Sequence, residues 1–113
     1  MNYHGKHVTL DAWLTEMPSA GALVAACEQA IDASGMSVEC AVRKDFKPHG
    51  LTAVWVLSES HFTIHTYPEH GYVSVDCYTC GDEGNPGKAI EALVAILPVR
   101  AHTVRELARG QAA

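Results

Sequence analysis

The chain has 113 residues, of which 48% are hydrophobic and 19% charged, so it can form one domain (residues 1–113) with a single core and is not disordered. Its formal net charge of −5 argues against nucleic-acid binding, which needs clustered lysine and arginine. No apolar run approaches the ~20 residues of a membrane span, and residues 1–11 contain no hydrophobic signal core, so we expect a cytoplasmic protein that does not bind membranes.

The first part of the chain predicts a strand, a helix and a second strand. Residues 7–11 are expected to form a short strand. Pro18 and Ser19 then open an amphipathic stretch with apolar residues at helical spacing, and Gly35 is placed to end that helix. Residues 36–42 indicate the second strand.

The middle of the chain predicts three consecutive strands. Residues 52–57, 61–67 and 72–79 are rich in β-branched and aromatic residues. The PEHG sequence at residues 68–71 is a four-residue hairpin connection between the last two strands.

The last part predicts a second helix and a final strand. Asn85 is suited to cap a helix, Pro86 to occupy its first position and Pro98 to end it, while residues 99–107 form the last strand. The resulting order is β-α-β-β-β-β-α-β. Helices segregated from a run of antiparallel strands predict an α+β fold, a two-layer sandwich with two helices on one sheet face.

Hairpin register separates the polar from the apolar side chains. If Tyr67 pairs with Tyr72, and a tight turn lies at residues 58–59, then Thr52 lies opposite His65 on the polar face. Cys80 falls on that face as well, so we expect a hydroxyl, an imidazole and a thiol near this turn. The core face then holds Phe62, Ile64, Val73, Val75 and Cys77.

The CxxC formed by Cys77 and Cys80 does not predict a disulfide or a metal site. An offset of three residues in a strand sends two side chains to opposite faces. Cys77 is therefore expected to pack in the core, and the sequence indicates no metal site.

The polar face has two interpretations. Alternating histidine, threonine and serine is ordinary on a solvated strand. The same groups are also components for nucleophilic and proton-transfer chemistry. A Ser-His-acid triad fits less well, because the chain contains no GxSxG elbow.

An ordered series of motifs runs through this region: SESH at 58–61, IHT at 64–66, PE at 68–69, GY at 71–72, VD at 75–76 and YTCG at 78–81. With GKH at 5–7 and Phe46, it resembles the short bacterial and archaeal class of S-adenosylmethionine decarboxylases over roughly residues 5–107.

The resemblance implies a pyruvoyl enzyme that makes its own cofactor by cutting the Glu59–Ser60 bond. The Ser60 hydroxyl attacks the Glu59 carbonyl carbon and forms an ester. Loss of the Cα proton of residue 60 eliminates that ester to dehydroalanine, which hydrolyses to a pyruvoyl group and ammonia. The products are a β-chain (1–59) and an α-chain (60–113), and the pyruvoyl group binds the substrate amine as a Schiff base.

The resemblance also implies roles for individual residues. Thr52 supplies a hydroxyl that helps processing, His65 removes the proton during elimination, and Cys80 is the proton donor in decarboxylation. The implied substrate-binding residues are Phe46 (facing adenine), Tyr67 (where tryptophan is frequent) and Glu69 (at the ribose hydroxyls). Phe46 has the alternative of anchoring its loop.

The implied assembly is a homodimer of αβ protomers with active sites at or near the subunit interface, and the implied product serves spermidine synthesis. Two other functions stay open. Relatives of this kind are believed to decarboxylate arginine or ornithine with the same machinery. A non-processing partner subunit is the other, against which the joint presence of Ser60, His65 and Cys80 argues.

Overall fold

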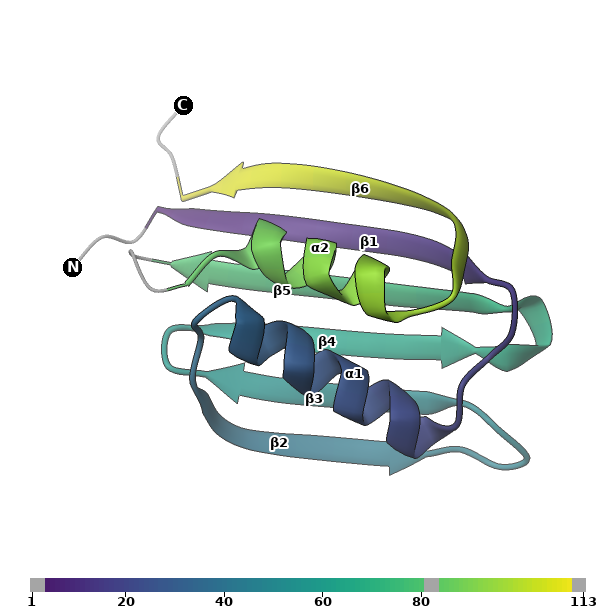
Figure 1. The fold of residues 1–113 in the computed structure, drawn as a ribbon. Coiled ribbons are helices and arrows are strands. Elements are labelled where there is room, and N and C mark those ends of the chain that lie inside the picture. Colours follow the sequence, from purple (N-terminus) through teal and green to yellow (C-terminus); the bar gives the residue numbers. More distant parts are fainter. Residues whose placement is uncertain (1–3, 81–83, 111–113) are drawn as a thin grey trace.

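The computed structural model describes residues 4–80 and 84–110. A six-stranded antiparallel sheet is covered on one face by two helices (Figure 1), which confirms the predicted sandwich and element order. The sheet order is β2-β3-β4-β5-β1-β6. The elements are β1 (Gly5–Leu14), α1 (Ala20–Ala33), β2 (Val38–Asp45), β3 (Leu51–Leu57), β4 (Ser60–Tyr67), the short 3-10 helix η1 (Pro68–His70), β5 (Tyr72–Cys80), α2 (Pro86–Ile96) and β6 (Val99–Arg109).

Both helices begin where the sequence predicts, and each has a side-chain cap, of which Asn85 was predicted. The Ser19 hydroxyl accepts a hydrogen bond from the Ala22 amide (3.1 Å), and the Asn85 side-chain oxygen accepts one from the Lys88 amide (3.1 Å). Each cap satisfies an amide that the first helical turn leaves free. After α1 the chain turns at Gly35, whose φ of 82° suits a residue without a Cβ.

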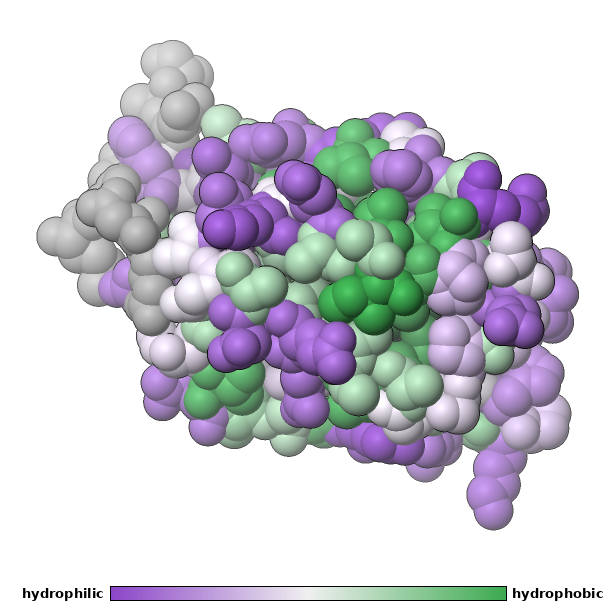
Figure 2. Space-filling model, in the orientation of Figure 1, coloured by the Kyte–Doolittle hydropathy of each residue, from purple (hydrophilic) through white to green (hydrophobic). Residues whose placement is uncertain are grey.

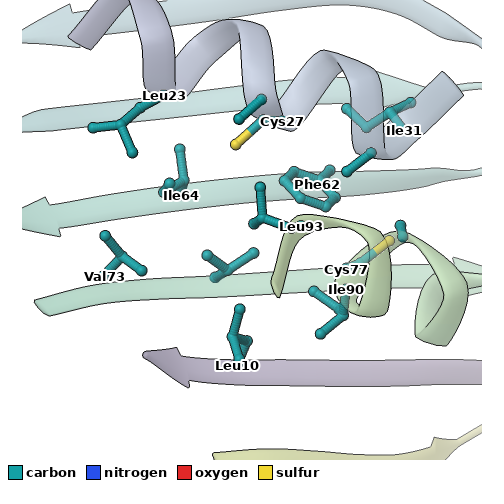
Figure 3. Packing of buried hydrophobic residues seen from close by; sticks show 14 of the residues in the cluster. Leu10, Leu23, Cys27, Ile31, Phe62, Ile64, Val73, Cys77, Ile90 and Leu93 are labelled. Atoms are coloured by element: carbon teal, nitrogen blue, oxygen red, sulfur yellow. The ribbon is translucent and has the colours of Figure 1, made fainter. Parts of the chain in front are cut away.

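The core lies between the helices and one sheet face (Figure 3). Its strand residues occupy alternate positions, as period-2 side-chain alternation requires. Phe62 and Cys77 are fully buried, as is Cys27 on α1. Burial raises the pKa of each of these two thiols to about 12, so both cysteines are packing residues.

The predicted hairpin register is confirmed. Tyr67 pairs with Tyr72, and Thr52 pairs with His65. Gly71 closes the β4–β5 connection with a φ of 61°, a left-handed conformation that favours glycine. The helix-free face therefore carries most of the polar residues of β4 and β5, whereas Thr66 and Thr79 are buried on the helix side.

Three strands differ from their predicted bounds by two residues or more at one end at least. β1 is longer than the predicted 7–11 because it is hydrogen-bonded on both sides, to β5 and to β6. β2 begins later than predicted, since Met36 is buried before the strand starts. β6 continues to Arg109 along its ladder with β1.

The helix side shows a mixed surface in Figure 2, with apolar residues gathered over part of it. Ile96 of α2 and Val104 of β6 are among the exposed apolar residues of the described chain. Neither helix in the described ranges is long and apolar enough to cross a bilayer.

Candidate active site

The Glu59–Ser60 bond lies at a tight turn between β3 and β4. Residues 58 and 59 form the turn, and Leu57 pairs with Ser60. The Glu59 carbonyl oxygen accepts two hydrogen bonds from one residue, from the Cys80 amide (3.3 Å) and the Cys80 thiol (3.1 Å). Two donors on one carbonyl oxygen are the arrangement that stabilises negative charge when a nucleophile attacks the carbonyl carbon.

A second group lies around the Thr52–His65 pair. The Thr52 hydroxyl is 3.1 Å from Nδ1 of His65. Both residues line a cavity of about 280 Å³, together with Phe46, Tyr67 and Glu69. Phe46 is half exposed, which argues against its being a buried anchor of its loop. The residues predicted to bind substrate and two residues predicted to act in processing thus share one cavity.

The two groups lie at opposite ends of the sheet. Ser60 and His65 are five residues apart along β4, which at about 3.3 Å per residue separates them by ~16 Å. Thr52, His65 and Cys80 do share the helix-free face, as predicted. The expectation that all three meet near the turn is wrong within one chain, because strand parity fixes a face and not a position along the strand.

The two cysteines of the CxxC separate as predicted. Cys77 is fully buried under the helices, and Cys80 lies partly exposed at the end of β5 on the other face. The structure therefore leaves Cys80 available to the Glu59–Ser60 peptide and keeps Cys77 away from it.

The helix-free face carries a polar cluster that the sequence did not predict. Oδ2 of Asp76 lies 2.7 Å from Nε2 of His7 and 2.9 Å from Nε2 of His61, and the Thr63 hydroxyl donates to Oδ1. Partial burial alone would raise the pKa of Asp76, but the hydrogen bonds from Thr63, His61 and His7 outweigh it and lower that pKa. Of these contacts, the predicted hairpin register implied only that Thr63 lies opposite Asp76. Arg109 extends the cluster by donating to Nδ1 of His7 at 3.2 Å.

The cluster is also a set of potential metal ligands. One ligand atom from each of His7, His61 and Asp76 lies within 4.8 Å of the others. The sequence alone indicates no metal site, and this juxtaposition arises through β1, whose partners the sequence did not reveal.

The chain is similar in sequence and in structure to proteins of known family. The model of the S-adenosylmethionine decarboxylase family matches residues 6–110. An S-adenosylmethionine decarboxylase proenzyme of Brevibacillus brevis is 39% identical over 109 residues, covering 94% of this chain and 82% of the relative. A proenzyme of the same name from Bacillus anthracis, numbered 2, is 40% identical and covers 94% and 89%. The crystal structure of the Aquifex aeolicus adenosylmethionine decarboxylase superposes with a TM-score of 0.88 at 27% identity, covering 100% of this chain and 96% of that one.

Proposed function

The chain belongs to the S-adenosylmethionine decarboxylase family, and from this premise we propose that it is a proenzyme that cuts itself at Glu59–Ser60 and then decarboxylates S-adenosylmethionine. The observation that carries the proposal is the Glu59 carbonyl, which already accepts two hydrogen bonds from Cys80. The nucleophile, the carbonyl and the donors needed for an N→O acyl shift are adjacent in the uncut chain.

The residues at this turn fit the precursor of a pyruvoyl group. Attack by the Ser60 hydroxyl places negative charge on the Glu59 oxygen, where the Cys80 amide and thiol stabilise it. Collapse breaks the peptide C–N bond and leaves Glu59 as an ester on Ser60. Removal of the Cα proton of residue 60 then releases the β-chain as its carboxylate. The pyruvoyl group supplies an electron sink for the decarboxylation.

The base that removes that Cα proton is assigned to His65 of a second copy of the chain. Within one chain His65 lies ~16 Å along β4 from Ser60. A two-fold axis through the helix-free face would place the Ser60 end of one copy against the His65 end of its partner. Each such contact is formed twice by symmetry, so one homodimer would hold two complete sites.

The helix-free face supports this dimer by its exposed apolar side chains. By strand parity Val42 of β2, Val56 of β3, Tyr67 of β4 and Leu107 of β6 share that face, and each is at least 43% exposed. A partly apolar face without helices is suited to pack against a copy of itself.

The cavity at the other end is suited to an adenosyl substrate. Phe46 and Tyr67 offer half-exposed aromatic rings for a purine, and Glu69 offers a carboxylate to ribose hydroxyls. In the free chain Oε2 of Glu69 lies 3.4 Å from Nδ1 of His49 on the neighbouring loop. Thr52 holds His65 at the same cavity through its hydroxyl. Arginine or ornithine would need neither ring, and nothing in the relatives favours these substrates or a non-catalytic subunit.

Intact-mass analysis tests the self-cleavage. The purified chain is expected to convert into fragments 1–59 and 60–113, the second with a pyruvoyl group in place of its N-terminal serine. Ser60→Ala should stay as one chain of 12.1 kDa. A wild-type chain that stays uncut, or cleavage at another bond, would contradict the proposal.

A further inference from the structure

Side chains of two strands, β1 and β4, form hydrogen bonds with one carboxylate on β5 near the cleavage site. Asp76 of β5 accepts hydrogen bonds from His7 of β1 and from His61 and Thr63 of β4. The side chains of His7 and Asp76 are 19% and 26% exposed. Hydrogen bonds to a charged acceptor are stronger than neutral ones, and partial burial protects them from competition by water.

The neighbours of His7 determine which of its ring nitrogens donates and which accepts. Arg109 can only donate, so its 3.2 Å contact requires Nδ1 of His7 to be the acceptor. A neutral His7 then carries its proton on Nε2 and donates it to Asp76. A metal at the cluster would need the lone pair of that nitrogen and would turn Nδ1 into a donor facing Arg109. These contacts therefore favour a hydrogen-bond network over a metal site.

The network reaches the cleavage site through His61 and Tyr78. His61 directly follows Ser60, so its hydrogen bond to Asp76 holds the residue next to the nucleophilic serine. The Tyr78 ring contacts both imidazoles, with its centroid 5.5 Å from that of His7 and 5.9 Å from that of His61. On β5, Asp76 and Tyr78 point to the same face as Cys80, which binds the Glu59 carbonyl.

The packing of Tyr78 explains a glycine on β1. A Cβ at Gly5 would lie 2.4 Å from the Tyr78 hydroxyl oxygen and 2.5 Å from the ring, closer than real Cβ contacts. Gly5 pairs with Cys80 in the β1–β5 ladder. The space that it leaves lets the Tyr78 ring lie over β1, next to Cys80.

We infer that Asp76 is a positioning residue for self-cleavage: through His61 it holds the chain after the Glu59–Ser60 bond in place, and through His7 it ties that segment to β1. This inference rests on the proposed function. Asp76 itself does not touch the reacting atoms in this account. Its effect is on the rate at which the uncut chain reaches the geometry for attack.

The rate of cleavage in purified uncut protein tests this inference. We expect Asp76→Asn and His7→Ala each to slow cleavage by roughly tenfold or more, the effect of losing a charge-assisted hydrogen bond. His7→Gln keeps a side-chain N–H donor and should recover most of the rate. Glu106→Gln is the matched control, because this carboxylate near the same end of the sheet is 57% exposed and pairs only loosely with Lys6 at 3.6 Å.

A double-mutant cycle separates positioning from general loss of stability. Since His7 acts through Asp76, a chain with both Asp76→Asn and His7→Ala should cleave about as slowly as Asp76→Asn alone. Independent structural damage would instead multiply the two reductions in cleavage rate. The nitrogen chemical shifts of the His7 ring should show the proton on Nε2 in wild type, and the Nε2 shift should move in Asp76→Asn, which lacks the charged acceptor.

The outcomes distinguish the inference from the function on which it rests. Wild-type cleavage with unchanged rates in Asp76→Asn and His7→Ala would overturn the inference alone, and absent wild-type cleavage would overturn the function. Cleavage that is lost after dialysis against EDTA and restored by Zn²⁺ would overturn positioning in favour of a metal site. If Asp76→Asn does not fold, the comparison of His7→Ala with His7→Gln still decides, because glutamine is expected to restore the cleavage rate that alanine loses.

Discussion

Co-expression of a Ser60→Ala chain with a His65→Ala chain should restore cleavage that neither variant performs alone. In one chain five residues of β4, or ~16 Å, separate Ser60 from His65, too far for direct proton transfer. In a mixed dimer the intact Ser60 of one chain meets the intact His65 of its partner. That composite site is complete, and the other site of the same dimer lacks both residues.

The expected yield follows from random pairing of equal amounts of the two chains. About half of the dimers are then mixed, so about half of the His65→Ala chains are cut. The Ser60→Ala chains stay whole because they lack the nucleophile. Intact-mass spectrometry measures both fractions at once, since the fragments carry the substitutions as mass labels.

A matched control uses a second chain that carries both substitutions. Mixing His65→Ala with the Ser60→Ala, His65→Ala double variant supplies no intact His65, and no cleavage is expected. If the first mixture also stays uncut although mixed dimers form, the reasoning that the site is shared between two copies is refuted. Cleavage of His65→Ala by itself would show that this histidine is not the base.

Three smaller predictions concern individual contacts. Thr52→Ala should slow cleavage about three- to tenfold by removing a neutral hydrogen bond to His65, and Thr52→Ser should stay within about twofold, as followed by gel densitometry. Cys80→Ser should leave the melting temperature unchanged but reduce CO2 release at least about 100-fold, because a hydroxyl is a far weaker acid than a thiol. Cys77→Ser should instead destabilise the fold by about 1–3 kcal/mol, because it buries a hydroxyl in the core. The pKa of Asp76 is lowered in the folded protein, so its charge stabilises the fold above the ordinary value of about 4 and that contribution is lost as the pH falls through the folded value. The difference in unfolding free energy between wild type and Asp76→Asn, measured in urea with cleavage blocked, should therefore be present at pH 7 and shrink as the pH falls below the ordinary carboxyl value of about 4. A difference that grows in acid would contradict this sign.

The local part of the fold was accessible from the sequence because short-range signals fix it. Tight turns and strand parity set the pairing of Tyr67 with Tyr72 and of Thr52 with His65. The caps Ser19 and Asn85 fixed where the helices start. Parity also separated a core cysteine from one on the polar face without any knowledge of the sheet order.

The pairing of strands that are distant in sequence could not be predicted in the same way. β1 lies between β5 and β6, far from both in sequence, and nothing local signals that position. The contact of His7 with Asp76 depends on it and was missed for that reason. The separation of Ser60 from His65 could have been found by counting residues along β4, and this count supports the proposed second copy.

Release of CO2 from carboxyl-labelled substrates tests the central claim most directly. Processed protein should release labelled CO2 from S-adenosylmethionine and not from arginine or ornithine at the same concentration. Ser60→Ala, which cannot form the pyruvoyl group, should release none. Release from arginine or ornithine in preference to S-adenosylmethionine, or equal release by Ser60→Ala, would contradict the account.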